Sequence, residues 1–537
     1  MAHARLHHGY SKTALALTLL GAAVSQAIAQ PFADAASSST GYAKGTLQPA
    51  QQCAALSTLA FSLQDVVQLN AEIVAASGDT PGHCHVSGTI APEIHFQVNL
   101  PAAWNGRFYM IGNGGHAGQQ PDDPFQLPNR NAALSHHFVM AMTDTGHDAA
   151  KEPGASFVVS NPQKAIDYAY RAVHVTAVAA KEIALAYYGQ PVQYAYWNSC
   201  SNGGRQGLLE AQRYPDDFDG IIANAPWVDQ TGFTIGAIWN QKAVADAALT
   251  PGKLATLASS VMQKCDAVDG LQDGLIDDPR QCDFKVARDV PACAAGADSD
   301  SCLSPLQAEA VQKVYDGPRD SSAKQLFPGF MPGSEALVQG PNGAASSWLG
   351  LIAPTGIDAK PADFNLAEGT MRYLVPLTPQ PDWDYSDFNF DTDPEQLDRW
   401  SRLADATDIN LRAFRAKGGK LLITYGWADS ILQPLMGVHY YEQALTANGA
   451  DGDGFMRLFM LPGMAHCAGG VGPDQHDPVT AIIDWVETGK APALITAKKV
   501  INGETVRSRP LCPYPQVARY RGQGSIDDAD NFSCQAP

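Results

Sequence analysis

The sequence predicts an α/β fold whose parallel central sheet is interrupted by one long insertion. Short apolar strands alternate with helices in both halves of the chain, and residues 230–400 between them lose this alternation. A hydrophobic content of 45% with 17% charged residues is typical of an ordinary globular protein, and 537 residues are enough for more than one structural unit. Disorder is therefore not expected to dominate the chain.

The first half supplies a series of predicted elements in strand and helix order. They are the strands 93–101, 106–115 and 137–146, the helix 161–189 and the strand 192–200. The second half continues with the strand 418–429, the helix 440–449, the strand 455–467 and the helix 477–489. We therefore expect residues 30–229 and 401–537 to form one catalytic domain, and residues 230–400, rich in Asp, Pro, Gly and Ser, to form a second domain inserted into it.

The N-terminus has the three parts of a secretory signal peptide, which we assign to residues 1–29. Arg5 and Lys12 lie in a basic stretch, an apolar run ends at Val24, and Ala27-Ile28-Ala29 provides an A-x-A cleavage site. This run is too short to cross a membrane, and no later run reaches about 18 uncharged apolar residues. We expect a protein that is secreted or periplasmic and has no membrane partner.

The net charge limits the possible binding partners, and the cysteine content indicates disulfides. The formal net charge of −19 disfavours binding to nucleic acid or to anionic membranes. Ten cysteines in an exported chain indicate up to five disulfides. Free thiols or a zinc site are the alternative, but no C-x-x-C pair occurs.

A candidate nucleophile lies between a predicted strand and a predicted helix. Residues 199–203 read Ser-Cys-Ser-Asn-Gly, which matches the G-x-S-x-G elbow except that Ser199 replaces the first glycine. Such a turn exposes the hydroxyl of the central serine, here Ser201, at the carboxyl edge of the sheet. The alternative is an ordinary surface turn at a helix start.

The partners that a serine nucleophile needs follow in the required chain order. Asp429 ends the predicted strand 418–429, and His466 lies in the loop after the strand segment "RLFML". His147 lacks such a position. The glycine-rich turn "IGNGGHAG" (residues 111–118) offers the N–H of Gly115, which together with that of Asn202 could stabilise an oxyanion, although a plain tight turn is equally consistent with this pattern.

Cysteines stand directly beside two of these residues. Cys200 precedes Ser201, and Cys467 follows His466. A disulfide between the two cysteines would join the serine elbow to the histidine loop and keep both side chains within reach of each other. The sequence therefore predicts a Cys200–Cys467 bridge.

The string C-S-x-G-G-R-Q (200–206) together with His466-Cys467 resembles the tannase and feruloyl esterase family of secreted α/β-hydrolases, over the range from Cys53 to Cys534. The resemblance implies an α/β-hydrolase fold in which residues 230–400 form a large lid domain. It also implies Ser201 as nucleophile, Asp429 as acid and His466 as base. Ser199 departs from the glycine that is usual in the family. The implied disulfides are Cys53–Cys84, Cys200–Cys467, Cys265–Cys282, Cys293–Cys302 and Cys512–Cys534.

An acidic loop within the insertion, "DAVDGLQDGLIDDPRQ" (266–281), could bind a hard cation. Three carboxylates recur between glycines, and the loop lacks the glutamate of an EF-hand at its twelfth position. An acidic surface loop without an ion is the alternative. The resemblance implies a structural Ca²⁺ held by Asp266, Asp269, Asp273 and the carbonyls of Leu271 and Leu275. The serine chemistry itself needs no organic cofactor.

The resemblance predicts hydrolysis of small aromatic acid esters, feruloyl or galloyl, which could be attached to plant polysaccharide or polyphenol. A hydrolase of terephthalate half-esters is an alternative, and it would need a cation such as Lys360 or Arg372 for the free carboxylate. A catalytically silent aromatic-binding protein and a peptidase or amidase are further alternatives. Candidate substrate contacts, which could equally be lid-core residues, are Trp348, Phe364, Tyr373 and Leu432.

Overall fold

The computed structural model describes residues 30–537 except 63–64, 336–337, 340–344, 357–358 and 450–453. The predicted signal peptide, residues 1–29, lies outside the described residues. A nine-stranded sheet forms the centre, in the order β1-β2-β3-β5-β4-β6-β7-β11-β12. The strands are β1 Val66–Val74, β2 His83–Ile90, β3 Ile94–Pro101, β4 Arg107–Met110, β5 Val139–Thr143, β6 Tyr194–Cys200, β7 Gly220–Asn224, β11 Lys420–Gly426 and β12 Met456–Leu461.

Most of this sheet is parallel. Strands β5, β4, β6, β7, β11 and β12 pair in parallel, whereas β1, β2 and β3 are antiparallel to one another and β3 is antiparallel to β5. The carboxyl ends of β6, β11 and β12 therefore meet at one edge, where a parallel α/β sheet places its functional loops. The predicted α/β fold with a mainly parallel sheet is confirmed.

Helices cover both faces of the sheet, so its central strands are buried on both sides. In β5, Val139 and Ala141 pack on one face with helices α3, α4 and α13, while Met140 and Met142 pack on the other with α1 and α14. These helices and the short α2 span α1 Leu127–Ser135, α2 Gln163–Ile166, α3 Ala172–Tyr188, α4 Asn202–Arg213, α13 Pro434–Asn448 and α14 Pro478–Thr488.

The helix predicted over 161–189 is interrupted once. Helix α2 passes through a π-helical turn, Asp167–Arg171, before α3 begins, and α3 ends at Gly189, which has φ 67°. A π turn widens the helix locally and often accompanies a functional site. The side chain of Tyr168 projects from this turn toward the candidate site described below.

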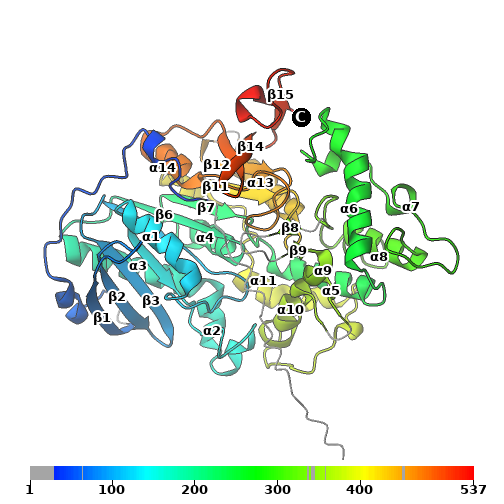
Figure 1. Ribbon diagram of the computed structural model, residues 1–537. Helices are drawn as coiled ribbons and strands as arrows, with labels where there is room; N and C mark the ends of the chain where they lie inside the picture. Colours follow the sequence, from blue (N-terminus) through cyan, green and yellow to red (C-terminus); the bar gives the residue numbers. More distant parts are fainter. Residues whose placement is uncertain (1–29, 63–64, 336–337, 340–344, 357–358, 450–453) are drawn as a thin grey trace, which may run out of the picture.

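The chain between β7 and β11 is mainly helical and lies beside the sheet, in green to yellow in Figure 1. Of the strands described in it, none joins the nine-stranded sheet. It contains α5 Gln230–Val244, α6 Pro251–Cys265, α7 Val286–Asp289, α8 Pro305–Asp316, β8 Val338–Gln339, β9 Ala345–Ser347, α9 Trp348–Leu351, β10 Ile352–Ala353, α10 Ala362–Gly369, α11 Asp398–Ala404 and α12 Arg412–Ala416. We call residues 230–400 the insertion.

Two hairpins follow α14 and return toward the insertion (Figure 1). They are formed by β13 Ile495–Ile501 with β14 Glu504–Leu511, and by β15 Val517–Tyr520 with β16 Phe532–Gln535. Within the described part of the chain, no helix is both long enough and apolar enough to cross a membrane.

Candidate active site

Ser201 sits at the sharp turn between β6 and α4. Its backbone has φ 63° and ψ −125°, a conformation that costs free energy for a residue other than glycine. The turn is held by hydrogen bonds from Ser201 N to the Asn224 carbonyl and from Trp227 N to the Ser201 carbonyl, both of 3.0 Å. Strained backbone of this kind is concentrated at functional sites, and here it keeps the serine at the carboxyl edge of the sheet.

Ser199, the departure from the usual glycine, is accommodated by Gly203. A Cβ added at Gly203 would overlap the Ser199 side chain, so α4 packs this closely on β6 only because position 203 is glycine. The Ser199 hydroxyl is buried and has no hydrogen-bond partner among the described residues. The elbow therefore tolerates serine at 199 at the expense of one unpaired hydroxyl.

His466 and Asp429 are joined by a hydrogen bond from Nδ1 to Oδ2, of 2.7 Å. Asp429 is fully buried after β11, and its Oδ1 accepts the backbone N–H groups of Ile431 (2.9 Å) and Leu432 (2.8 Å). These two donors fix the carboxylate. Because a carboxylate only accepts, Nδ1 of His466 carries the proton and Nε2 is left to take one up.

A disulfide joins Cys200 to Cys467, with their Cα atoms 6.0 Å apart. Strands β6 and β12 are separated in the sheet by β7 and β11, a distance of about 14 Å at the usual strand spacing. The bridge thus draws the loop after β12 back over the sheet edge toward the elbow. A ring nitrogen of His466 lies within 4.8 Å of both sulfurs, and because the sulfurs are bonded to each other they do not form a metal site.

The other four disulfides have the pairing that the resemblance implies. They are Cys53–Cys84, Cys265–Cys282, Cys293–Cys302 and Cys512–Cys534, and no cysteine is free in the described residues. Five disulfides are consistent with an oxidising compartment.

The structure brings the glycine-rich turn 111–118 against the elbow. The Asn202 side chain donates from Nδ2 to the Asn113 carbonyl (3.1 Å), and the Tyr168 hydroxyl is 3.1 Å from the Gly115 carbonyl oxygen. Asn202 is the first residue of α4, so its backbone N–H has no acceptor inside the helix. The two predicted oxyanion donors, Gly115 and Asn202, therefore belong to segments that are in contact.

Three residues beside this site were not predicted. His116 Nε2 lies 3.1 Å from the Thr370 hydroxyl of the insertion, and burial lowers the pKa of His116 to about 3, so its imidazole is neutral. Trp227 is buried next to the elbow, with its ring 5.9 Å from that of His116. The sequence offered one signal, that His116 directly follows Gly115; the other two contacts depend on tertiary structure.

The predicted substrate contacts are placed in several different environments. Trp348 is fully buried beside Tyr315 (5.0 Å between ring centroids), and Phe364 is buried beside Tyr385 (5.0 Å). Leu432 is buried in the loop that holds Asp429, and Tyr373 is half-buried in the insertion. None of the contacts described for Trp348, Phe364 or Tyr373 is with Ser201, Asp429 or His466.

Leu366, not predicted, approaches the glycine-rich turn instead. A Cβ added at Gly115 would lie 3.6 Å from Leu366 Cδ2, so helix α10 of the insertion covers this turn. The cations considered for a free carboxylate, Lys360 and Arg372, both pair with Glu368, at 2.6 and 2.9 Å.

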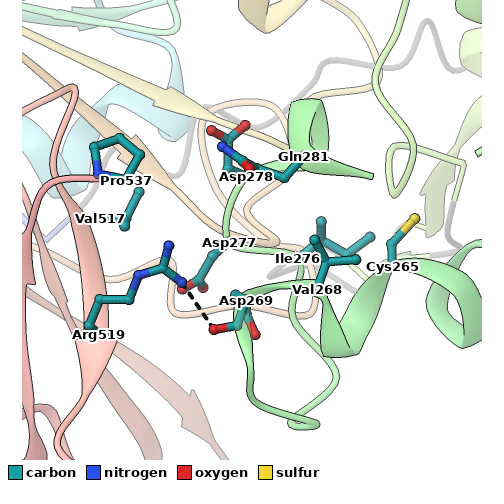
Figure 2. A pocket seen from close by; sticks show the side chains of 10 residues that line it. All are labelled: Cys265, Val268, Asp269, Ile276, Asp277, Asp278, Gln281, Val517, Arg519 and Pro537. Carbon is teal, nitrogen blue, oxygen red and sulfur yellow. Dashed lines mark hydrogen bonds between the residues drawn. The ribbon is translucent and has the colours of Figure 1, made fainter. Parts of the chain in front are cut away.

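The acidic loop of the insertion faces the C-terminal hairpin (Figure 2). Asp266 Oδ1 accepts the N–H groups of Asp273 and Gly274, and the Asp269 carbonyl accepts from Arg519. Asp277, which was not predicted, is half-buried beside them and lines a cavity with Asp269 and Arg519. Burial and the charges of Asp269 and Asp273 raise the pKa of Asp277 to about 7.

The charges of Asp269 and Asp273 disfavour a charged Asp277, and a cation would relieve this repulsion. Arg509 pairs with Asp273 and supplies part of that compensation. In the described residues, however, the carboxylates of this loop do not bring three ligand oxygens within 4.8 Å of one another. Leu271 and Leu275, whose carbonyls were the remaining predicted ligands, donate their N–H groups to Asp269 Oδ1 (2.8 Å) and Asp273 Oδ1 (3.1 Å), so both lie within this loop cluster.

A second polar cluster, His174, Glu210 and Asp217, lies at the far end of α4. Their ligand atoms are within 4.8 Å of one another, and His174 Nδ1 is 2.5 Å from Asp217 Oδ2. Burial raises the pKa of Glu210 well above its usual range, and the half-buried Lys181 ammonium interacts with it. A neutral Glu210 that donates to Asp217 accounts for this cluster without an ion.

Comparison with known proteins agrees with this geometry. Residues 79–535 match the family model described as tannase and feruloyl esterase. A mono(2-hydroxyethyl) terephthalate hydrolase from Piscinibacter sakaiensis is 33% identical over 87% of both chains, and a probable feruloyl esterase from Arthroderma benhamiae is 32% identical over 81% of both. The crystal structure of feruloyl esterase B from Aspergillus oryzae superposes with a TM-score of 0.77 at 25% identity, over 90% of this chain and 100% of that one. The strained serine elbow and the histidine–aspartate pair thus lie in a chain that belongs to the tannase and feruloyl esterase family of carboxylic ester hydrolases.

Proposed function

We propose that the protein hydrolyses esters of aromatic acids, with Ser201 as nucleophile, His466 as general base and Asp429 as the group that orients the histidine. The hydrogen bond of His466 to a buried, doubly anchored Asp429 carries this proposal, because it leaves Nε2 as the only free proton acceptor of the ring. The strained turn at Ser201 and the Cys200–Cys467 bridge support it.

The chemistry follows from these groups. Ser201 Oγ attacks the ester carbonyl carbon and passes its proton to His466 Nε2, and the N–H groups of Asn202 and Gly115 bind the oxyanion. The intermediate collapses, and the alcohol leaves with the proton from His466. Water, deprotonated by His466, then attacks the acyl-enzyme, which releases the acid and restores Ser201.

An uncharged phenolic ester, feruloyl or galloyl, is the substrate class we favour. Half-esters of terephthalate are the alternative, since one relative is named for that activity. That substrate carries a carboxylate, but Lys360 and Arg372 share the single carboxylate of Glu368, so both cations already take part in ion pairs. A neutral acyl group requires no such cation, and the natural alcohol could be plant polysaccharide or polyphenol.

The insertion would serve as the lid domain over the catalytic domain formed by residues 30–229 and 401–537. The contacts of Leu366 and Thr370 with the glycine-rich turn support this role. A Ca²⁺ ion, held by Asp266, Asp269 and Asp273 with the carbonyls of Leu271 and Leu275, would be structural and would neutralise the acidic loop. Trp348, Phe364, Tyr373 and Leu432 remain candidate pocket residues.

Export is the remaining part of the proposal. The predicted signal peptide over residues 1–29 would direct the chain to the periplasm or the medium, where the five disulfides form.

The test is kcat/KM for methyl ferulate, methyl gallate and mono(2-hydroxyethyl) terephthalate, with Ser201→Ala as the matched variant. We expect turnover of a neutral phenolic ester at least about 10-fold above the half-ester, equal to about 1.4 kcal/mol of transition-state discrimination. A half-ester preference of that size would instead establish the alternative. Undiminished turnover by Ser201→Ala would overturn the mechanism, and aromatic ligand binding without any turnover would establish a silent binding protein.

A further inference from the structure

Tyr168 contacts both segments that carry the proposed oxyanion donors. Its ring is buried, and its hydroxyl lies 3.1 Å from the Gly115 carbonyl oxygen and 3.2 Å from Asn202 Oδ1. Gly115 belongs to the glycine-rich turn and Asn202 to the serine elbow. One hydroxyl group therefore sets the spacing between two chain segments that are nearly ninety residues apart.

Gln230 and Trp400 fix the direction of the Tyr168 hydroxyl. The indole N–H of Trp400 can only donate, and it donates to Gln230 Oε1 (2.7 Å). This orients the amide so that Gln230 Nε2 donates to the Tyr168 hydroxyl (2.9 Å). The hydroxyl must then use its own proton in the other direction, toward Gly115 and Asn202.

These two partners come from opposite ends of the insertion. Gln230 is the first residue of α5, and Trp400 lies in α11, with its ring stacked on that of Tyr168 at 5° and 6.3 Å between centroids. The beginning and the end of the insertion thus meet at one side chain beside the glycine-rich turn.

Arg205 completes the arrangement from the other side. It is fully buried, its Nε donates to Asn202 Oδ1 (2.7 Å), and its guanidinium carbon lies 4.9 Å above the Tyr168 ring. Its Nη1 donates to the carbonyls of Ala169 (3.0 Å) and Ala404 (2.7 Å). The Asn202 side chain is therefore held by Arg205, Tyr168 and the Asn113 carbonyl at once.

We propose that Tyr168 is a positioning residue of the oxyanion site. Gln230 and Trp400 orient its hydroxyl, so the two ends of the insertion determine the spacing of the two oxyanion donors. This inference rests on the proposed function, because it assigns the N–H groups of Gly115 and Asn202 to the oxyanion. None of the contacts described for Tyr168 is with Ser201, Asp429 or His466. Its effect is on the spacing of the two donors, and so on the transition state rather than on the bound ester.

Tyr168→Phe is the first variant, because it keeps the ring and its packing and removes only the hydroxyl. We expect kcat to fall about 10-fold to 100-fold, with KM changed less than about 3-fold. Tyr170→Phe, in the same π turn with its ring beneath Arg213, is the matched control and keeps wild-type kcat. Trp400→Phe, which keeps a ring but frees the Gln230 amide, lowers kcat in the same direction and serves if Tyr168→Phe does not fold.

An arylboronic acid separates positioning from a general loss of structure, because it forms a tetrahedral adduct with a serine nucleophile. We expect Tyr168→Phe to weaken boronate inhibition by the same factor as kcat/KM and to leave inhibition by the free product acid unchanged. Equal weakening of both inhibitors, or kcat within 2-fold of wild type, would overturn the inference. Ser201→Ala, measured in parallel, distinguishes failure of this inference from failure of the proposed function. Retained turnover by Ser201→Ala would overturn the proposed function.

Discussion

Gly203 packs against Ser199 so closely that any side chain at position 203 would overlap the Ser199 hydroxyl. The absence of a side chain at Gly203, in the first turn of α4, thus leaves room for the side chain of Ser199 near the end of β6. With serine at position 199, a residue larger than glycine at position 203 would require one of the two segments to shift.

Gly203→Ala should reduce the free energy of unfolding by about 1–3 kcal/mol, the usual range for overpacking, and should lower kcat/KM by displacing Ser201. Ser199→Gly, which removes the overlapping side chain, should be near neutral alone and should restore most of the loss in the double variant. Urea denaturation and ester kinetics on all three proteins measure the coupling. Additive effects would show that the two positions do not interact.

Asp429→Asn should lower kcat by about 10³-fold to 10⁴-fold while the fold is retained. The amide oxygen can still accept from Ile431 and Leu432, so its NH₂ group faces His466 Nδ1. Nδ1 must then accept and Nε2 must carry the proton, which is the wrong tautomer for a base. Steady-state kinetics with a thermal melt test this, and kcat near that of wild type would remove Asp429 from the triad.

Replacing Cys200 and Cys467 together by Ser should lower kcat/KM by more than 10-fold, because the loop that carries His466 loses its tether to the elbow. Stability should also fall by about 2–4 kcal/mol. The matched control removes Cys293 and Cys302, which close a loop of separation 9 in the insertion, and it should leave kcat/KM unchanged. Equal kinetic losses in both pairs would contradict a specific role for the Cys200–Cys467 bridge.

Without calcium, stability should decline as the pH rises from about 4 to about 7. Burial and the charges of Asp269 and Asp273 raise the pKa of Asp277 to about 7, so the folded chain keeps a proton that the unfolded chain has already released. This stabilisation is fully present at pH values below the pKa that Asp277 has in the unfolded chain. It is lost as the pH rises to the pKa of about 7 that Asp277 has in the folded chain. Its size is a few kcal/mol at most.

Added Ca²⁺ should flatten this decline, and Asp277→Asn should flatten it without calcium. Asp363→Asn is the control, since burial raises the pKa of Asp363 to about 7 as well, far from the acidic loop in sequence. Asp363→Asn should change the dependence of stability on pH by the same amount with and without Ca²⁺. Thermal melts across this pH range, with calcium or with chelator, measure each case, and an unchanged profile on adding Ca²⁺ would argue against a cation in the loop.

The sequence predicted the elements that depend on local pattern. Strands β4, β5, β6, β11 and β12 are short apolar runs, and the positions of the elbow and of the loops that carry Asp429 and His466 follow from where those runs end. Strand β1 was missed because it is largely exposed at the sheet edge and lacks a continuous apolar pattern. Helix α13 begins at Pro434, six residues before the predicted start, since proline is well suited to a first turn.

Tertiary contacts explain what sequence could not supply. Tyr168 lies in a segment predicted as a helix with an ordinary apolar face. Its hydroxyl is recognised as a link between the glycine-rich turn and the serine elbow only from the π turn and the hydrogen bond from Gln230. Thr370 reaches His116 only because the insertion folds back over the sheet edge. The sequence left Trp348 as either a substrate contact or a core residue of the insertion, and its ring contacts in the structure are with Tyr315 and Phe330.

The bridge between Cys200 and Cys467 also bears on the order in which the proposed catalytic site can be assembled. The two cysteines are 267 positions apart, so Ser201, the proposed nucleophile, is synthesised long before His466, the proposed base. The disulfide can join their loops only after the whole insertion has been made and both thiols have been oxidised. A newly made chain in a reducing cytoplasm lacks that tether. We therefore expect the proposed esterase activity to stay low until these thiols have been oxidised.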